Sequence, residues 1–290
     1  MHLHAPVTST RPAVSRRGGS PVRAAYTRLA AVLPLFSVVE TAPGEPLPAG
    51  DGWTPAAALA APGPVRDAFL AEDAAQMTRD FGGTPRPDVV AGFSLHRYAW
   101  PACLLFTVPW FLHRRVPDIP LDATAVRRGG GPLAVRVESF SCLPGDPAAT
   151  LPGARVMPDE EALRARVREA VATHLGPLLE GFGPLMRRRG RALWGLATDE
   201  ITEGLWYAGR VLGAEPRARA DLRRLLPGGT APFAGAAAFR GLAAPDGTAL
   251  TTRDRASCCM FYTLRPQDTC VTCPRTCDAE RISKLTATAA

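Results

Sequence analysis

The sequence predicts an α+β fold: a mainly helical chain with a small antiparallel sheet, followed by a small metal-binding domain near the carboxyl end. Long segments with apolar residues at helical spacing predict the helices, and one segment of strict alternation predicts the sheet. Five of the seven cysteines fall within twenty residues, which predicts the metal-binding domain. With 290 residues, 46% hydrophobic and 21% charged, the chain forms one large domain or two smaller ones, which excludes fibrous and wholly disordered classes.

The first segment, residues 1–24, is predicted to be a disordered basic leader. Arg16-Arg17 followed by the apolar run 29–39 loosely resembles a twin-arginine export signal. Pro34 interrupts that run, and no small-x-small cleavage site follows it. We therefore expect a cytoplasmic protein.

The next segments are predicted to be helices separated by a connector. In order, we expect a helix, or a strand and a turn, over 26–39, a Pro/Gly-rich connector over 41–66, a short helix over 68–81, and one or two buried helices over 87–115. Proline lacks a backbone N–H, so the last of these should break near Pro101 or Pro109. Its apolar run is shorter than the ~20 residues that a bilayer requires, so we expect no membrane span.

The second half alternates a strand with helices. After a glycine turn at 129–131, apolar and polar residues alternate over 133–139, the period of a half-buried strand. Apolar residues at helical spacing then predict a helix from 158, kinked or ended at Gly176-Pro177, a second over 191–212 stopped by Gly213, a third over 217–226, and a loop over 227–247.

The charge is mildly basic, with a net +7 carried almost entirely by arginine, since Lys284 is the only lysine. Arginine suits anionic partners, but no basic block is interleaved with aromatic residues, so we expect no nucleic-acid partner. Two arginine runs, 114–115 and 187–189, are expected to be solvated helix ends.

Four cysteines form the pattern C-C-x10-C-x2-C: Cys258, Cys259, Cys270 and Cys273. A disulfide framework is expected mainly in short secreted chains with an even cysteine count. This chain is long, has an odd count and is not expected to be secreted. Thiolates are soft ligands that favour zinc, Cu(I) or iron–sulfur clusters. Adjacent residues tend to point in different directions, so the first pair suits two metal centres better than one small tetrahedral ion.

The three remaining cysteines are not expected to bind metal. Cys103 and Cys142 are expected to be small buried side chains. Cys277 would share a helical face with Cys273 if 273–284 were helical, and we expect it to be a neighbour of the site and not a ligand.

The run Arg255–Tyr262, the spacing to Cys270 and Cys273, and the step to Pro274 resemble the carboxyl-terminal 2Fe-2S domain of the FhuF-like ferric siderophore reductases. The resemblance implies that Cys258, Cys259, Cys270 and Cys273 hold a 2Fe-2S cluster.

Two upstream segments, Ser94–Tyr98 and Leu193–Ala197, resemble the same family more weakly and in the right order. The resemblance therefore spans roughly residues 60–280, with the last thirty specific enough to carry function. It implies a siderophore-binding domain over 25–246 and a cluster domain over 247–290.

The implied activity is that of a ferric siderophore reductase, an oxidoreductase that passes one electron from the cluster to Fe(III)-siderophore and releases Fe(II) for iron assimilation. Such a reaction needs no catalytic acid or base. No dinucleotide-binding fingerprint is present, so a ferredoxin, flavodoxin or flavoprotein reductase is the expected electron donor. His96 and Tyr98 are possible pocket residues, but we expect them to be satisfied in the core.

Phe261 and Tyr262, beside the cysteines, are expected to shield the cluster or to pack its small domain.

Two other functions remain open at this point. The cysteines would be structural in a zinc-stapled ligand-binding protein without enzymatic activity. A siderophore-biosynthesis protein is the other alternative, because the upstream region of the family is distantly similar to part of the siderophore synthetases. That alternative needs an ATP site, and the sequence has no glycine-rich phosphate loop followed by Lys-Ser or Lys-Thr.

Overall fold

A computed structural model describes residues 19–128 and 131–289. Most of the expected leader, residues 1–18, and part of the expected glycine turn, residues 129–130, lie outside the described residues. For residues 19–24, which the structure describes, the predicted disorder is wrong, because Val22 is fully buried and a helix begins at Arg23. The division into a domain over 25–246 and a domain over 247–290 stays a prediction.

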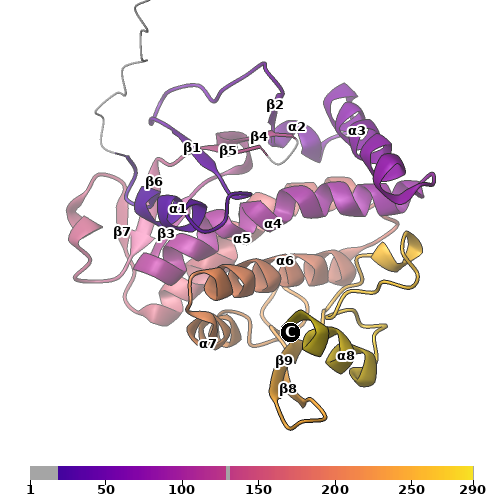
Figure 1. The fold of residues 1–290 in the computed structure, drawn as a ribbon. Helices are drawn as coiled ribbons and strands as arrows, with labels where there is room; N and C mark the ends of the chain where they lie inside the picture. The colour runs from indigo at the N-terminus through magenta and orange to yellow at the C-terminus, as the bar shows by residue number, and fades with distance from the viewer. Residues whose placement is uncertain (1–18, 129–130, 290) are drawn as a thin grey trace, which may run out of the picture.

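The described residues contain eight α-helices and nine strands (Figure 1). The helices are α1 (Arg23–Ala30), α2 (Ala57–Ala60), α3 (Pro64–Phe81), α4 (Pro87–His113), α5 (Glu160–Phe182), α6 (Gly190–Val211), α7 (Glu215–Leu225) and α8 (Asp278–Ala289). The strands are β1 (Val38–Thr41), β2 (Trp53–Pro55), β3 (Arg115–Asp118), β4 (Thr124–Arg127), β5 (Leu133–Arg136), β6 (Ser139–Cys142), β7 (Ala154–Val156), β8 (Phe239–Ala243) and β9 (Ala249–Arg253). The fold is therefore α+β and mainly helical, as predicted.

The strands of the described residues form three small sheets. One has the order β1-β5-β4-β2, a second the order β3-β6-β7, and β8 and β9 form a hairpin. The first two are mixed, because β1 pairs with β5 and β6 with β7 in parallel, whereas the sequence predicted one antiparallel sheet. The long connection from β1 to β5 contains α2, α3 and α4, and a connection of that length permits a parallel pairing.

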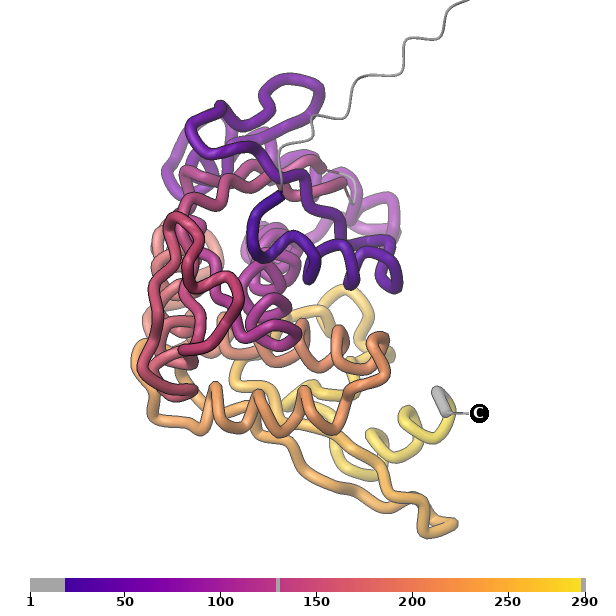
Figure 2. Tube along the Cα trace, turned by 90° about the vertical axis from the view of Figure 1, so that its left-hand side faces the viewer, coloured from indigo at the N-terminus to yellow at the C-terminus, as the bar shows by residue number. Residues whose placement is uncertain are grey.

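The helix α4 lies at the centre of the molecule and packs against α1, α3, α5 and α6. In Figure 1 the sheet containing β1 and β5 lies on one side of α4, and α6 and α7 lie on the other. Figure 2 shows the β8–β9 hairpin and α8 extending from one end of this body.

The prediction that α4 breaks at a proline is wrong, since it runs unbroken through Pro101 and Pro109. Pro109 has no N–H to donate to the carbonyl of Leu105 one turn earlier. The hydroxyl of Tyr26, on α1, donates to that carbonyl at 2.8 Å. A side chain distant in sequence thus supplies the donor that the helix lacks.

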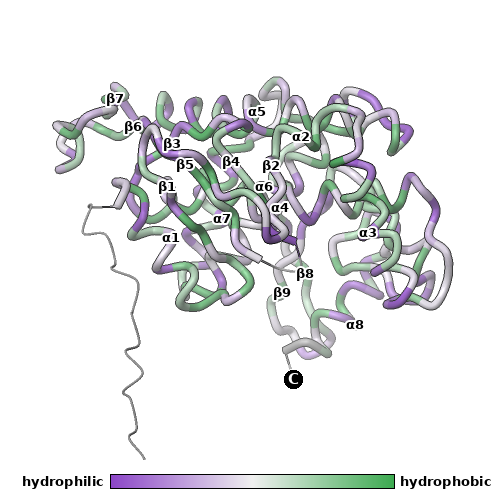
Figure 3. Tube along the Cα trace, turned by 90° about the horizontal axis from the view of Figure 1, so that it is seen from above, coloured by the Kyte–Doolittle hydropathy of each residue, from purple (hydrophilic) through white to green (hydrophobic). Residues whose placement is uncertain are grey.

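The helix α5 likewise continues through Gly176-Pro177, where the sequence predicted a kink or an end. Leu175 and Leu178, on either side of the pair, are fully buried, so packing against the core offsets the missing hydrogen bond. Asp159 caps the start of the helix by accepting from the N–H of Ala162 at 2.8 Å. In Figure 3 hydrophobic and hydrophilic residues alternate along α5, as expected of a helix with one buried face.

The helices over 68–81, 191–212 and 217–226 are present as α3, α6 and α7, with starts that differ by one to four residues. Gly213 follows α6 at a φ of 70°, the left-handed conformation of a helix stop. The connector over 41–66 was predicted without regular structure, but β2 and α2 lie within it, and β8 lies within the predicted 227–247 loop. Pairing with strands distant in sequence forms β2, which a local pattern does not reveal.

Within the described part of the chain, no helix combines the length and the apolar character needed to cross a bilayer.

Candidate functional site

The four predicted ligands lie in the segment between β9 and α8, which runs along the amino-terminal half of α6. The segment contains little regular structure beyond a short 3-10 turn at Phe261–Thr263. Such a segment needs contacts from outside itself to hold its shape, and buried charged residues on α6 provide them.

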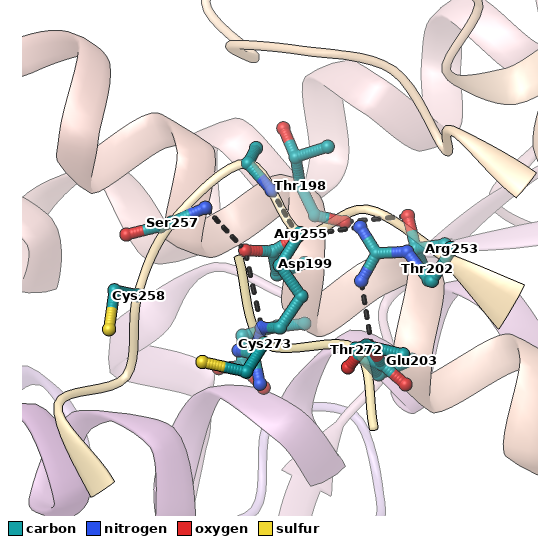
Figure 4. Close-up of polar contacts among 12 residues, drawn as sticks. Thr198, Asp199, Thr202, Glu203, Arg253, Arg255, Ser257, Cys258, Thr272 and Cys273 are labelled. Atoms are coloured by element: carbon teal, nitrogen blue, oxygen red, sulfur yellow. Dashed lines mark hydrogen bonds and ion pairs between the residues drawn. The ribbon is translucent and has the colours of Figure 1, made fainter. Parts of the chain in front are cut away.

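Asp199, on α6, fixes the backbone just before the first cysteine pair (Figure 4). Its carboxylate accepts hydrogen bonds from the N–H groups of Ala256 at 2.9 Å and Ser257 at 2.8 Å, and from Arg253 at 2.6 Å. The side chains of Asp199 and Arg253 are completely buried. Burial raises the pKa of Asp199, and the charges of Arg253 and Arg255 oppose that effect. A buried carboxylate with this many donors is a rigid anchor.

Glu203, one turn further along α6, holds the second cysteine pair. Its Oε1 accepts from the hydroxyl of Thr272, between Cys270 and Cys273, at 2.9 Å. The same oxygen accepts from Arg253 at 2.9 Å, so one arginine joins both anchors. The two halves of the cysteine pattern are thereby held against one helix.

Two further contacts bring the first pair close to the helical body. Arg188 donates to the Ser257 hydroxyl at 2.8 Å and to the Cys258 carbonyl at 2.5 Å. The expectation that 187–189 is only a solvated helix end is therefore wrong for Arg188. Gly195, on α6, lets the loop approach, because a Cβ there would lie 3.2 Å from the Ala256 carbonyl oxygen.

The other arginine run also differs from its prediction. Arg114 pairs with Glu160 at 3.1 Å and with Asp221 at 3.0 Å, and Arg115 pairs with Asp146 at 2.7 Å. Both arginines therefore form ion pairs with carboxylates from distant parts of the chain, so they connect structural elements and are not merely solvated.

The second pair is further fixed from α8 and from the turn before it. Arg281 donates to the Cys273 carbonyl at 2.9 Å, and Thr276 donates to the Cys270 carbonyl at 3.1 Å. The helix begins at Asp278, so the idea that 273–284 is one helix with Cys273 and Cys277 on one face is wrong. Hydrogen-bonded turns precede it, leaving Cys273 buried and Cys277 exposed.

The thiols interact with one another and with backbone N–H groups. The neighbouring Cys270 thiol lowers the pKa of Cys259 to about 5, and the neighbouring Cys259 raises the pKa of Cys270. The N–H of Met260 donates to the Cys258 sulfur at 3.4 Å, and that of Arg275 donates to the Cys273 sulfur at 3.4 Å. N–H donors of this kind stabilise thiolates and tune the clusters that thiolates hold.

Among the described residues, no three histidine, cysteine or carboxylate side chains are grouped closely enough to hold a single metal ion. Cys103 and Cys142 are fully buried in α4 and β6, as predicted. The assignment of Cys258, Cys259, Cys270 and Cys273 as ligands stays a prediction.

A cavity of 460 Å³ lies between the cysteine segment, α4, α6 and the turn before α6. Its wall contains Asp88, Gly92, Phe93, His96, Met186, Arg187, Arg188, Leu196, Glu200, Arg255, Cys258, Cys259, Met260, Phe261 and Cys270. Phe261 packs against Phe81 and Phe93, with ring centroids 5.8 and 5.9 Å apart. Three of the four predicted ligands thus face one hollow with a largely apolar wall.

His96 lines this cavity and bonds to Glu200, its Nδ1 lying 2.8 and 2.9 Å from the two carboxylate oxygens. The charge of Glu200 raises the pKa of His96. The side chain of His96 is 44% exposed, so it is not the core residue that we expected. Tyr98 fits that expectation, because it is buried and bonds to His174 at 2.8 Å.

Sequence reasoning missed Asp199, Glu200 and Glu203 as site residues. The available signal was three acidic residues within five positions of a helix that is otherwise largely apolar, together with Arg253 and Arg255 just before the cysteines.

Comparison with models of protein families matches residues 255–275 to the FhuF 2Fe-2S C-terminal domain. The matched segment contains all four cysteines of the pattern, which confirms the resemblance of this part of the chain. No curated protein matches the chain significantly.

Proposed function

We propose that the protein is a ferric siderophore reductase in which Cys258, Cys259, Cys270 and Cys273 hold a 2Fe-2S cluster. In this proposal residues 247–290 carry the cluster and residues 25–246 contribute the siderophore-binding surface. The observation that carries the proposal is that the segment similar to an iron–sulfur domain presents three of the four cysteines to one cavity beside α4 and α6.

The donor set supports a cluster. Four thiols within one segment supply the four soft ligands that a 2Fe-2S cluster takes. Backbone N–H groups already point at the sulfurs of Cys258 and Cys273. The nearby guanidinium groups of Arg188 and Arg255 favour thiolate charge, because opposite charges at short range stabilise one another.

Bound there, a 2Fe-2S cluster supplies one electron at a time to a ferric ion. Hard oxygen ligands hold Fe(III) far more tightly than Fe(II), so the reduced chelate releases Fe(II) for iron assimilation. A reduced ferredoxin, flavodoxin or flavoprotein reductase provides that electron and is itself oxidised by one electron per iron. No proton transfer by a side chain is required, and free thiols of this kind persist in the reducing cytoplasm, where we place the reaction.

The protein's own contribution is to position the cysteines and limit the access of water. Asp199 and Glu203 hold the two pairs against α6, and Phe261 closes one side of the cavity against Phe81 and Phe93. Electrostatics and solvent exposure around the sulfurs are among the factors that set a cluster's potential, so these contacts matter to the chemistry.

The test is the visible and EPR spectrum of the anaerobically purified protein, with iron, sulfide and zinc assayed on the same sample. We expect about two irons and two sulfides per chain and an S = 1/2 signal on reduction. The reduced protein should then reduce a ferric hydroxamate or catecholate in a stoichiometric, single-turnover reaction.

Variants assign the ligands. Serine at 258, 259, 270 or 273 should abolish the signal, and the matched variant Cys277→Ser should keep it, because Cys277 is exposed and outside the four-cysteine pattern. A colourless protein that holds one zinc, and stays colourless after anaerobic reconstitution with iron and sulfide, would contradict the proposal and favour a zinc-stapled binding protein.

A further inference from the structure

The cavity beside the cysteines is larger than a cluster requires. Its volume is 460 Å³. A two-iron, two-sulfide core is four atoms, and at ~30 Å³ for each water-sized unit it fills roughly 120 Å³. More than half of the cavity is therefore left for another molecule.

Part of the cavity wall comes from α4 and the turn before α6. Gly92 and Phe93 lie on α4, and Met186 and Arg187 lie in the turn. A Cβ on Gly92 would meet only the Cε of Met186, at 3.7 Å, so this glycine leaves room on the wall. Aromatic and thioether side chains offer a hydrocarbon-binding surface.

Two polar groups on this wall have bonding capacity to spare. Among the described residues, the side chain of Arg187 makes no hydrogen bond or ion pair, and its neighbour Asp88 is already bonded to Arg86 at 3.0 and 2.5 Å. His96 uses only Nδ1, towards Glu200, which leaves Nε2 open to a ligand in the cavity. By contrast Arg188 and Arg255, on the cysteine side, already have partners.

A second cavity of 600 Å³ lies on the other side of His96, lined by Trp100, Arg97 and Arg128 among others. Two of its three arginines, Arg97 and Arg128, are bonded to the buried carboxylate of Asp73, at 2.7 and 2.6 Å, and the third, Arg127, makes no side-chain hydrogen bond or ion pair among the described residues. It does not include the cysteines. Both cavities thus offer an unpartnered arginine, and the first is the better candidate because it also adjoins the thiols.

We propose that the part of the 460 Å³ cavity lined by Gly92, Phe93, His96 and Arg187 binds the metal-bearing part of the substrate chelate, the Fe(III) ion with its anionic oxygen ligands. Arg187 and His96 contact the iron-bound oxygens, and Phe93 and Met186 contact the hydrocarbon of the chelator. This inference rests on the proposed function, and it places the ferric ion in the same hollow as the cysteines, so that no relay is needed between them.

Gallium(III) chelates test the site without turnover, because Ga(III) has the charge and nearly the size of Fe(III) but is not reduced under these conditions. The gallium complexes of a trihydroxamate and of a tricatecholate are titrated separately into the anaerobically purified full chain by calorimetry. The tighter one is carried to the variants. We expect one molecule bound per chain.

Two pairs of matched variants locate the chelate. Gly92→Leu places a large side chain in the cavity and should weaken binding of the chelate at least about tenfold. Gly92→Ala adds only a methyl group, for which there is space, and should leave the affinity within about twofold of the wild-type value. Arg187→Ala should weaken binding about fivefold, and Arg189→Ala, which removes an arginine that does not line this cavity, should not. His96 lines both cavities, so its variants do not distinguish them.

The result separates this inference from the proposed function. Binding that survives Gly92→Leu and Arg187→Ala, or that neither gallium chelate shows, overturns the inference even if the cluster spectrum and iron reduction are intact. If Arg127→Ala in the second cavity abolishes binding of the gallium chelate and Gly92→Leu does not, the inference is overturned as well. Binding that follows the expected variants in a protein without cluster or reductase activity supports the site and contradicts the reductase.

Discussion

Asp199 and Glu203 lie one turn apart on α6, and each bonds the segment that carries one of the two cysteine pairs. Asp199 accepts from the backbone next to Cys258, and Glu203 accepts from Thr272 between Cys270 and Cys273. Arg253 donates to both carboxylates from a fully buried position. The distance between the two halves of the site is thus set by the rise of a helix, a rigid spacer.

Asp199→Asn should destabilise the protein by about 3–5 kcal/mol, because it leaves the buried guanidinium of Arg253 without full compensation. The measurement is urea unfolding followed by circular dichroism, with iron content assayed alongside. The matched control is Glu138→Gln, which also removes an arginine partner but from an exposed pair with Arg136, and which should change stability by less than about 1 kcal/mol. Equal effects of the two variants would show that burial of the Asp199 pair does not matter.

Gly195→Val should displace the loop before the first cysteine pair, because even a Cβ would lie 3.2 Å from the carbonyl oxygen of Ala256. We expect iron per chain to fall to about half or less while the helical content stays near wild type. The control is Gly204→Val, which crowds Leu104 between α4 and α6 and not the cysteine segment. It should cost about 1–3 kcal/mol of stability yet leave iron per folded chain unchanged, and the reverse pattern would contradict the role of Gly195.

Tyr26→Phe should destabilise the protein by about 1–3 kcal/mol, because the carbonyl of Leu105 then loses its donor within the core. Pro109→Ala restores a backbone N–H one turn after Leu105. In that background Tyr26→Phe should cost about 1 kcal/mol less, and the difference is measured by a double-mutant cycle in urea. A coupling energy of zero would mean that Tyr26 does not compensate for the proline.

His174 should make stability depend on pH below neutrality. Burial lowers the pKa of this imidazole to about 4, with the Ile119 carbonyl partly opposing. Since the pKa of the unfolded chain is higher, at 6.5, its stabilising contribution is complete above pH 6.5 and is lost as the pH falls towards 4. The shift corresponds to roughly 3 kcal/mol across that window.

Urea unfolding at several pH values checks this, and His174→Gln should flatten the profile between pH 6.5 and 4. His96→Gln is the control. Glu200 raises the pKa of His96, so its contribution is present below pH 6.5 and is lost only as the pH rises above that value. The slope below pH 6.5 should therefore survive this change, and an unchanged slope in His174→Gln would disprove the assignment.

The helices were predictable where their own residues determine them. The apolar stripe of α6 and the stop at Gly213 are local, and both were predicted correctly. The continuity of α4 could not be predicted locally, because the donor that replaces the missing N–H of Pro109 belongs to Tyr26, more than seventy residues earlier. Rules for proline describe an isolated helix, and tertiary contacts override them.

The candidate site likewise has a part that the sequence predicts and a part that it does not. The spacing of the cysteines is visible in the sequence, whereas the residues that hold them are ordinary charges whose partners lie 50 to 70 residues away, as for Asp199 with Ala256 and Arg188 with Ser257. A charged side chain on a solvated face and one in a buried network look alike in sequence. His96 was misjudged for the same reason, since Glu200 and the cavity come from elsewhere in the chain.

The dependence of the cysteine segment on α6 also implies an order of events during synthesis. The ribosome makes α4 and α6 well before Cys258, and completed parts of a chain begin to fold while later parts emerge. We therefore expect the carboxylates of Asp199 and Glu203, which bond the cysteine segment in the finished fold, to be in place when the thiols leave the exit tunnel. We expect the emerging thiols to settle against this scaffold, which shortens the time that they stay open to oxidation.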